Sequence, residues 1–186
     1  MQLEVSARHV HLSREDLDTL FGPGAELTPK RELSQPGQYL SEQRVTIIGP
    51  KGRKERTAVL GPTRKASQVE LSKSDCVELG IKAPLRESGD VAGSAPITIE
   101  GPCGTVHLKE GAIIAHNHIH VTTEDSVLLD LKDKQRVSVA VMTERPVVFR
   151  DVIIRVSPNF SCKMHIDFDE ANAALVSDFT LGKIIK

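Results

Sequence analysis

Two His-x-His pairs are the residues of this sequence whose type and spacing could most readily do chemistry. His9 and His11 form the first pair, and His118 and His120 form the second. Side chains two positions apart in a β-strand leave the same face about 6.5–7 Å apart, so two imidazoles at this spacing can converge on one metal ion. A single pair is more often structural, but two pairs in matched contexts favour metal binding.

A local pattern that occurs four times in the chain supplies a third ligand for each pair. In every copy a Ser, Thr or Asp precedes an acidic residue by three positions, which is a capping-box pattern that marks a helix start. A His or Glu stands two positions before each presumed N-cap, and these four residues are His11, Glu70, His120 and His165. Since two of them already belong to the pairs, Glu70 and His165 are the predicted third ligands.

The sequence therefore predicts two metal sites with three protein ligands each. The first is His9, His11 and Glu70, and the second is His118, His120 and His165. Three ligands are typical of a catalytic zinc site that keeps one position open. Nitrogen and oxygen ligands also suit cobalt, manganese or iron, so zinc is the preferred ion among several. The pattern leaves three other candidates outside the sites, namely His107, His116 and Cys162.

Arg64 is the candidate anion-binding residue. It lies in the sequence GPTRK at 61–65, which we interpret as a turn that presents two cations beside the strand of Glu70. A guanidinium can donate two parallel hydrogen bonds to a phosphate, although a solvent-facing turn explains this short sequence equally well. A second polar turn at 83–90 contains Arg86 and is expected to be a salt-bridged loop. Neither a P-loop nor a G-x-G-x-x-G motif is present.

The elements that must position these residues are mainly short β-strands. Apolar runs rich in Val and Ile alternate with Gly-Pro pairs, a pattern typical of a β-sandwich or of small barrels. Helices are expected to be few, brief and placed after the four capping patterns. Because the four copies pair as first with third and second with fourth, the chain is predicted to contain two related halves, residues 1–115 and 116–186. The opening strand, residues 2–7, could pair with either half.

Composition excludes several classes of function. The 186 residues are 39% hydrophobic and 26% charged, as in an ordinary globular protein, and the net charge of −1 offers no basic field for nucleic acid. With five Phe, one Tyr and no Trp, the chain has few platforms for stacking bases. No apolar run approaches the roughly 18 residues of a membrane span. Three scattered cysteines without a C-x-x-C motif predict neither disulfides nor a zinc ribbon, and they fit a reducing cytoplasm.

Five stretches of the sequence closely resemble the PduL-type phosphotransacylases, or phosphate propanoyltransferases. They are SARHVHLS at 6–13, ELSQPGQ at 32–38, GPTRK at 61–65, IKAPLRESGD at 81–90, and MHID at 164–167 with DEANAA at 169–174. The resemblance covers essentially the whole chain. It implies a mainly β fold with short helices, in which two related small β-barrels carry the metal sites at their interface.

The resemblance also implies an activity and its substrates. Acyl-CoA, with a propanoyl or acetyl group, and phosphate would be interconverted with acyl phosphate and CoA at a dinuclear zinc site, one ion on each predicted ligand set. Arg64 would handle phosphate, and contacts to coenzyme A would carry over to Ser6, Asn172, Lys30 and Gln38. Two alternatives stay open, namely a metal-dependent acyl-CoA thioester hydrolase and a non-catalytic scaffold protein of a bacterial microcompartment.

Two departures from the family pattern bear on the site and the location. Asn117 stands where the family usually has an Arg before the second His-x-His, which removes one cation. Members associated with microcompartments of propanediol degradation carry an N-terminal amphipathic extension, whereas this sequence begins at its first strand. We therefore expect a bacterial cytoplasmic protein, or a microcompartment protein whose extension has been removed. The acyl preference, the direction of the reaction and the formation of a homo-oligomer are not fixed by the sequence.

Overall fold

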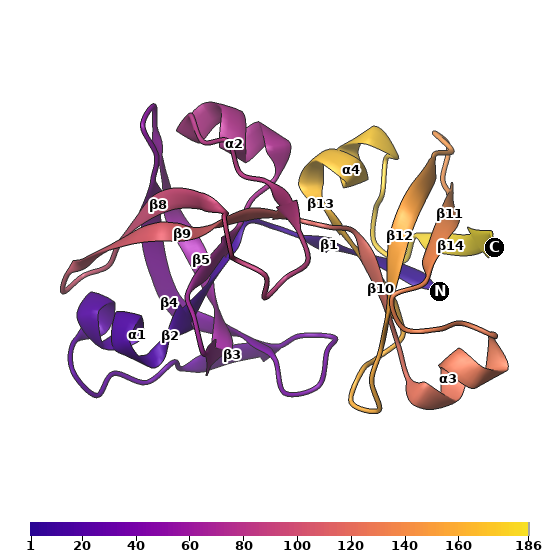
Figure 1. Ribbon diagram of the computed structural model, residues 1–186, viewed down its shortest axis with the longest axis horizontal. Helices are drawn as coiled ribbons and strands as arrows, with labels where there is room; N and C mark the ends of the chain where they lie inside the picture. Colours follow the sequence, from indigo (N-terminus) through magenta and orange to yellow (C-terminus); the bar gives the residue numbers. More distant parts are fainter. Residues whose placement is uncertain (186) are drawn as a thin grey trace. The chain divides into compact units, whose positions relative to one another are not determined.

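The computed structural model describes residues 1–185, and their contacts divide them into two compact units (Figure 1). We name each unit after one of its candidate ligands. The Glu70 unit contains residues 8–33 and 37–115, and the His165 unit contains residues 1–7, 34–36 and the chain from 116 onward. None of the helices within residues 1–185 combines the length and the apolar content needed to cross a bilayer.

The Glu70 unit is a closed barrel with two helices and two accessory strands. Strands β4, β5, β2, β6, β9 and β8 pair in that order, and β8 pairs with β4 to close the ring. The strands of this unit are β2 (His9–Ser13), β3 (Pro29–Glu32), β4 (Tyr39–Ile48), β5 (Arg53–Arg64), β6 (Gln68–Glu70), β7 (Leu85–Arg86), β8 (Ala95–Glu100) and β9 (Thr105–Ala115), and the helices are α1 (Arg14–Phe21) and α2 (Lys73–Leu79).

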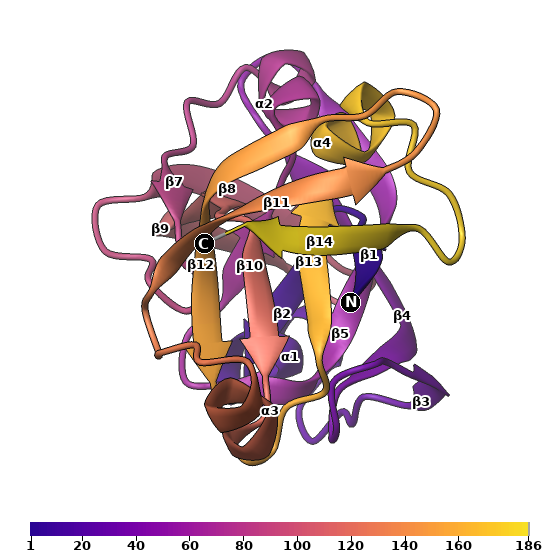
Figure 2. The same cartoon turned by 90° about the vertical axis from the view of Figure 1, so that its right-hand side faces the viewer.

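The His165 unit is a second closed barrel of six strands, in the order β1, β13, β10, β12, β11 and β14. Figure 2 shows β10 between β12 and β13, with α3 following the end of β10. Its elements are β1 (Gln2–Ser6), β10 (His118–Val121), α3 (Thr123–Leu128), β11 (Arg136–Met142), β12 (Val148–Val156), β13 (Lys163–Asp167), α4 (Phe168–Ala173) and β14 (Leu181–Ile185). The predicted mainly β fold with two small barrels is therefore confirmed.

Both barrels set a His-x-His strand between the same kinds of neighbour. In the Glu70 unit, β2 runs parallel to β5 and antiparallel to β6, and His9 pairs with Glu70. In the His165 unit, β10 runs parallel to β12 and antiparallel to β13, and His118 pairs with His165. Directly paired residues of adjacent strands project from the same face of a sheet. Strand register alone thus places each third candidate ligand beside its pair.

One strand of each barrel is followed directly in sequence by the His-x-His strand of the other barrel. Strand β9 comes just before β10 in sequence, yet it pairs with β6 and β8 in the Glu70 unit. Strand β1 comes just before β2, yet it pairs in parallel with β13 over five positions, from Gln2 with Lys163 to Ser6 with Asp167. The opening strand, which the sequence leaves open to either half, thus belongs to the barrel of His165.

Two separate hydrophobic cores fill the barrels and orient the candidate ligands. Val10 and Ile119, the middle residues of the two pairs, are fully buried in the core of the Glu70 unit and of the His165 unit, respectively. Because successive side chains of a strand point to opposite faces, burying the middle residue turns both flanking imidazoles to the other face. The apolar position inside each pair is thus what aims its two histidines together.

All four predicted helix starts are confirmed. Ser13, Ser72, Thr122 and Asp167 are the N-caps of α1 to α4, and each side chain accepts a hydrogen bond from the backbone N–H three residues later. In α2 and α4 the acidic residue returns the bond to the backbone of the cap, which completes the capping box. Each cap lies at the end of a strand that carries a candidate ligand, or within two residues of that end.

We expect Ser72→Ala to lower the free energy of unfolding by about 1 kcal/mol, because the backbone N–H of Asp75 loses its capping acceptor. Urea unfolding followed by circular dichroism measures this change. Lys73→Ala, at an exposed position in the first turn of the same helix, is the control and should change stability by less than about 0.5 kcal/mol. Equal losses in the two variants would contradict the capping role.

Candidate metal and anion sites

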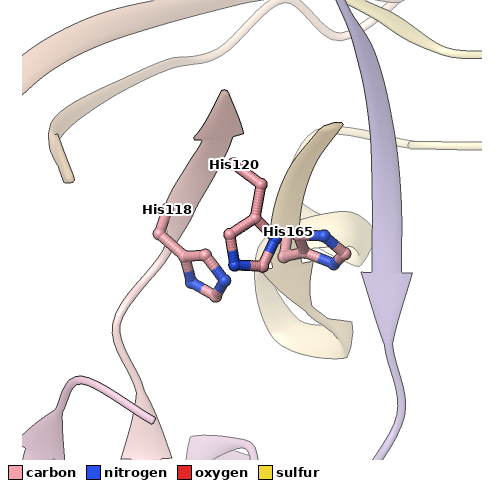
Figure 3. Close-up of side chains that lie close together, drawn as sticks. All are labelled: His118, His120 and His165. Atoms are coloured by element: carbon pink, nitrogen blue, oxygen red, sulfur yellow. The ribbon is translucent and has the colours of Figure 1, made fainter. Parts of the chain in front are cut away.

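The three histidines of the His165 unit point toward one another (Figure 3). His118 and His120 come from β10, and His165 comes from the neighbouring strand β13. Their ring centroids lie 4.7–5.2 Å apart, and each ring offers a nitrogen within 4.8 Å of those of the other two. Three imidazole nitrogens at this separation form a ligand set that suits zinc and other divalent transition metals.

Hydrogen bonds from outside the cluster orient two of these rings. His118 donates its Nδ1–H to the backbone carbonyl of His116 at 2.8 Å, which selects the tautomer whose Nε2 lone pair can bind a metal ion. His165 Nδ1 lies 3.5 Å from Oε2 of Glu4, whose carboxylate also accepts a hydrogen bond from Ser34. A histidine that donates its outer N–H to a carbonyl or carboxylate has its tautomer and ring orientation fixed for ligation.

Gln35 lies beside the same cluster. It belongs to residues 34–36, a short segment of the His165 unit that interrupts the Glu70 unit in sequence. Its buried amide lies 3.3 Å from His165 Nε2 and makes two hydrogen bonds with the backbone of Ser161, at 3.0 and 3.1 Å. A metal ion bound to His165 Nε2 would take the place of the first contact, while the two bonds to Ser161 would hold the amide beside it.

His120 is held in the neutral form that metal binding requires. Burial lowers its pKa to about 2, and the charges of His118, His165 and Arg155 act in the same direction. Its buried Nδ1 has no hydrogen-bond partner within residues 1–185. A neutral imidazole is the ligating state. This protonation state and the chemistry of the donor set fit a metal ion.

The second cluster, in the Glu70 unit, is more deeply buried. His9 Nε2 lies 3.2 Å from His11 Nε2 and 3.5 Å from Glu70 Oε2, and His11 Nε2 lies 3.8 Å from Glu70 Oε1. Side chains of all three residues are at most 11% exposed, so a metal ion there would have little competition from solvent. Among the described residues, neither cluster includes His107, His116 or Cys162.

The electrostatics of this cluster favour a carboxylate with a neutral imidazole beside it. Burial lowers the pKa of His11 well below its usual value, and the charges of His9 and Arg64 add to this effect. For Glu70, burial alone would raise the pKa. Electrostatic interactions with the His9 and His11 imidazoles and hydrogen bonds from His9 and Ser88 together outweigh burial and lower it. An ionised Glu70 beside a neutral His11 is the protonation state that metal ligation needs.

A hydrogen-bond network that sequence reasoning missed holds Glu70 in place. The Ser88 hydroxyl and the Gln68 amide both donate to Glu70 Oε1 at 2.6 Å, and Gln68 Oε1 in turn accepts from the backbone N–H of Gly89 at 2.7 Å. Oε1 is thereby occupied, which leaves Oε2 to face His9. Ser88 lies in the segment predicted to be a salt-bridged loop, and the ion pair of Arg86 with Asp90 at 3.8 Å confirms that prediction. No local signal marks Ser88 itself.

Arg64 is connected to this network, although the predicted turn around it is wrong. Residues 61–64 continue β5 to its end, because Gly61 pairs with Tyr39 and Arg64 pairs with Ser13. From this strand end, Arg64 donates a hydrogen bond to Ser88 Oγ at 3.1 Å. Its charge also contributes to the lowered pKa of His11, so the guanidinium acts on the cluster electrostatically.

The residues expected to contact coenzyme A lie in both units. Ser6 pairs with Asp167 at the start of α4, and the exposed Asn172 lies within that helix. Lys30 is exposed on β3, and the carbonyl of Gln38 accepts a hydrogen bond from Leu33 N at 2.9 Å. Their role toward coenzyme A stays a prediction.

Asn117, which stands where the resemblance leads us to expect an Arg, has a structural partner in the His165 unit. Its side-chain amide donates to Oε1 of Glu170 at 2.6 Å, and the other oxygen of Glu170 accepts from the backbone N–H of Asp167 in the capping box of α4. Asn117 therefore connects the start of β10 to the helix that follows His165.

We expect Ser88→Ala to weaken metal binding in the Glu70 unit about 10- to 100-fold, the usual cost of removing an outer hydrogen bond to a metal ligand. The reason is that Glu70 Oε1 loses one of its two donors. Competition with a chromophoric chelator measures the affinity. Ser94→Ala, at a buried serine of the same unit that bonds Gly111 N, controls for the loss of a buried hydroxyl and should leave metal affinity unchanged. Equal weakening in both variants would count against the specific role of Ser88.

Comparisons with known proteins agree over the whole chain. A family model described as Phosphate propanoyltransferase matches residues 2–177. The chain is 50% identical over 186 residues to a phosphate propanoyltransferase of Clostridioides difficile, covering 100% of this chain and 89% of the relative. It is 50% identical over 183 residues to one of Thermotoga maritima, covering 98% and 87%, and 53% identical over 180 residues to one of Priestia megaterium, covering 97% and 83%.

Proposed function

The chain belongs to the phosphate propanoyltransferase family and is a phosphotransacylase, and we propose that it transfers a propanoyl or acetyl group using zinc at both clusters. In the reaction the acyl carbon loses its bond to the CoA sulfur and gains a bond to a phosphate oxygen, giving acyl phosphate and CoA. The observation that carries the metal-dependent form of this proposal is the pair of three-ligand clusters, one in each barrel.

The ligands in this proposal are the residues of the two clusters. His9, His11 and Glu70 would hold one zinc ion, and His118, His120 and His165 would hold the other, giving two ions per chain. Bound zinc supplies Lewis acidity and an affinity for thiolate, both of which suit the cleavage and formation of a thioester. The neutral state of His120 and the anionic state of Glu70 support this assignment, because neither has to change protonation to ligate.

The chain's own side chains account for the handling of phosphate. Arg64 donates a hydrogen bond to Ser88, and a planar guanidinium at this position can donate to phosphate oxygens and neutralise their charge. Ser6, Lys30, Gln38 and Asn172 are proposed contacts of coenzyme A, on the strength of the resemblance. A bacterial cytoplasmic location, a homo-oligomer and microcompartment association are proposals of the same kind.

The test is acyl-CoA consumption with and without phosphate, with the product trapped as a hydroxamate. We expect consumption to depend on phosphate and to yield one acyl phosphate per thioester used. Consumption that proceeds equally without phosphate would favour the thioester hydrolase, and no consumption by a protein without bound metal would favour the scaffold. Comparing acetyl-, propanoyl- and butanoyl-CoA in the same assay establishes the acyl preference.

A further inference from the structure

Arg155 is a cation beside the three-histidine cluster that the proposed reaction has not used. It lies near the end of β12 and pairs with His120 of β10 in the parallel ladder. Directly paired residues leave the same face of a sheet, so the Arg155 side chain starts on the face of the cluster. Phe160 lies against both residues, with its ring centroid 4.1 Å from that of His120 and 6.0 Å from the Arg155 guanidinium carbon.

The guanidinium of Arg155 has no acceptor within the described chain. Its side chain makes neither a hydrogen bond nor an ion pair with any group of residues 1–185, although the residue is half-buried. Two carboxylates of the same barrel have other partners, since Glu4 faces His165 and Ser34, and Asp133 accepts from the backbone N–H of Val156. A guanidinium carries five N–H donors, and partly buried donors are normally satisfied.

Three arginines used for comparison have the acceptors that Arg155 lacks. Arg136 is ion-paired with Asp151 at 2.6 Å, and Arg8 is ion-paired with Asp75 at 2.9 Å. Arg64, the arginine at the other cluster, donates to Ser88. The position matched to Arg155 in the other barrel is Leu60, which pairs with His11, so the fold itself does not require a cation there.

We propose that Arg155 forms a second anion site, at which a phosphoryl group of a substrate binds beside the three-histidine cluster. The planar guanidinium matches two oxygens of a phosphoryl group, and its carbon lies over the Phe160 ring at 6.0 Å from the centroid, within the range of a cation–π contact. Two substrates of the reaction carry phosphoryl groups, namely inorganic phosphate and coenzyme A. This inference therefore rests on the proposed function. It adds Arg155 to Arg64 as a second arginine that would bind a phosphoryl group.

The experiment compares ligand binding by zinc-loaded wild-type protein and its Arg155→Ala variant in calorimetric titrations. Inorganic phosphate, CoA and dephospho-CoA are titrated separately. We expect one of the phosphoryl ligands to bind about 10- to 100-fold more weakly to the variant, the cost of losing charged hydrogen bonds. Weaker phosphate binding assigns the site to inorganic phosphate. Weaker binding of CoA alone assigns the site to the 3′-phosphate, which dephospho-CoA lacks. Equally weaker binding of CoA and dephospho-CoA assigns it to the pyrophosphate.

Two further variants control for indirect effects. Arg150→Ala removes an exposed arginine from the same strand and should leave all affinities within twofold of wild type. Arg155→Lys keeps the charge but lacks the planar guanidinium that donates two parallel hydrogen bonds. Its affinity should therefore lie between those of wild type and Arg155→Ala. Metal content and Tm are measured for each protein, so that a loss of zinc is not mistaken for a loss of anion binding.

The outcomes separate this inference from the proposed function. Unchanged affinity for all three ligands in Arg155→Ala, with zinc retained, would overturn the anion site even if wild-type turnover depends on phosphate. Weakened binding in a protein that consumes acyl-CoA without phosphate would retain the anion site and reject the transacylase proposal.

Discussion

Glu70→Gln is expected to reduce bound metal by one ion per chain and to lower turnover by a factor on the order of 10²–10³, because several kcal/mol of metal-derived stabilisation would be lost. The substitution keeps the shape of the side chain and an oxygen for Ser88 and Gln68, but it removes the charge that a metal ion needs from this ligand. Elemental analysis of the purified variant, together with the acyl phosphate assay, measures both effects.

The matched control for this variant is Glu15→Gln, at an exposed glutamate on α1. It makes the same change of charge away from the cluster and should retain full metal content and activity. A Glu70→Gln protein that still holds two ions per chain would show that this carboxylate is not a ligand. If it kept one ion and full turnover, the metal in the Glu70 unit would be dispensable for the reaction.

Arg64→Ala is expected to raise the KM for phosphate about 10- to 100-fold, since a charged hydrogen-bond donor to the anion would be lost. The KM for acyl-CoA should change much less. Metal content should be retained, because Ser88 and Gln68 can still donate to Glu70 Oε1 when Arg64 is replaced. Initial rates over a matrix of phosphate and acyl-CoA concentrations separate the two constants.

Lys65→Ala is the control for Arg64→Ala, because Lys65 is the adjacent cation and is exposed. It should leave both constants near those of wild type. Arg64→Lys should fall between wild type and Arg64→Ala, since an ammonium group provides charge without the planar fork. Phosphate-dependent turnover that stays near wild type in Arg64→Ala, with metal retained, would refute the assigned role of Arg64.

Of the candidate site, the sequence predicted mainly which residues form the two clusters. Alternation along a strand places His9 with His11 and His118 with His120, and the capping pattern predicts where Glu70 and His165 stand relative to the helix starts. The structure brings each third residue beside its pair by direct strand pairing. Metal binding by the two clusters stays a prediction for experiment.

Other features depended on neighbours that local sequence does not reveal. The segment GPTRK at 61–65 has turn-forming residues, yet its first four positions remain in β5 because β4 and β2 pair with them. Likewise, the polar segment at 83–90 gives no reason to choose Ser88 over its other residues. Only the fold brings Ser88 within 2.6 Å of Glu70.

By itself the sequence determined the strand-rich class, the four helix starts and the two groups of candidate ligands. These depend on side-chain alternation and on capping within a few residues, which are local properties of the backbone. Tertiary structure decided that β1 joins the barrel of His165, that Gln35 reaches His165, and that Arg155 lies beside His120. Those placements bring together segments that are far apart in the chain. The pairing register of the strands sets them, and the packing of the two separate cores selects that register.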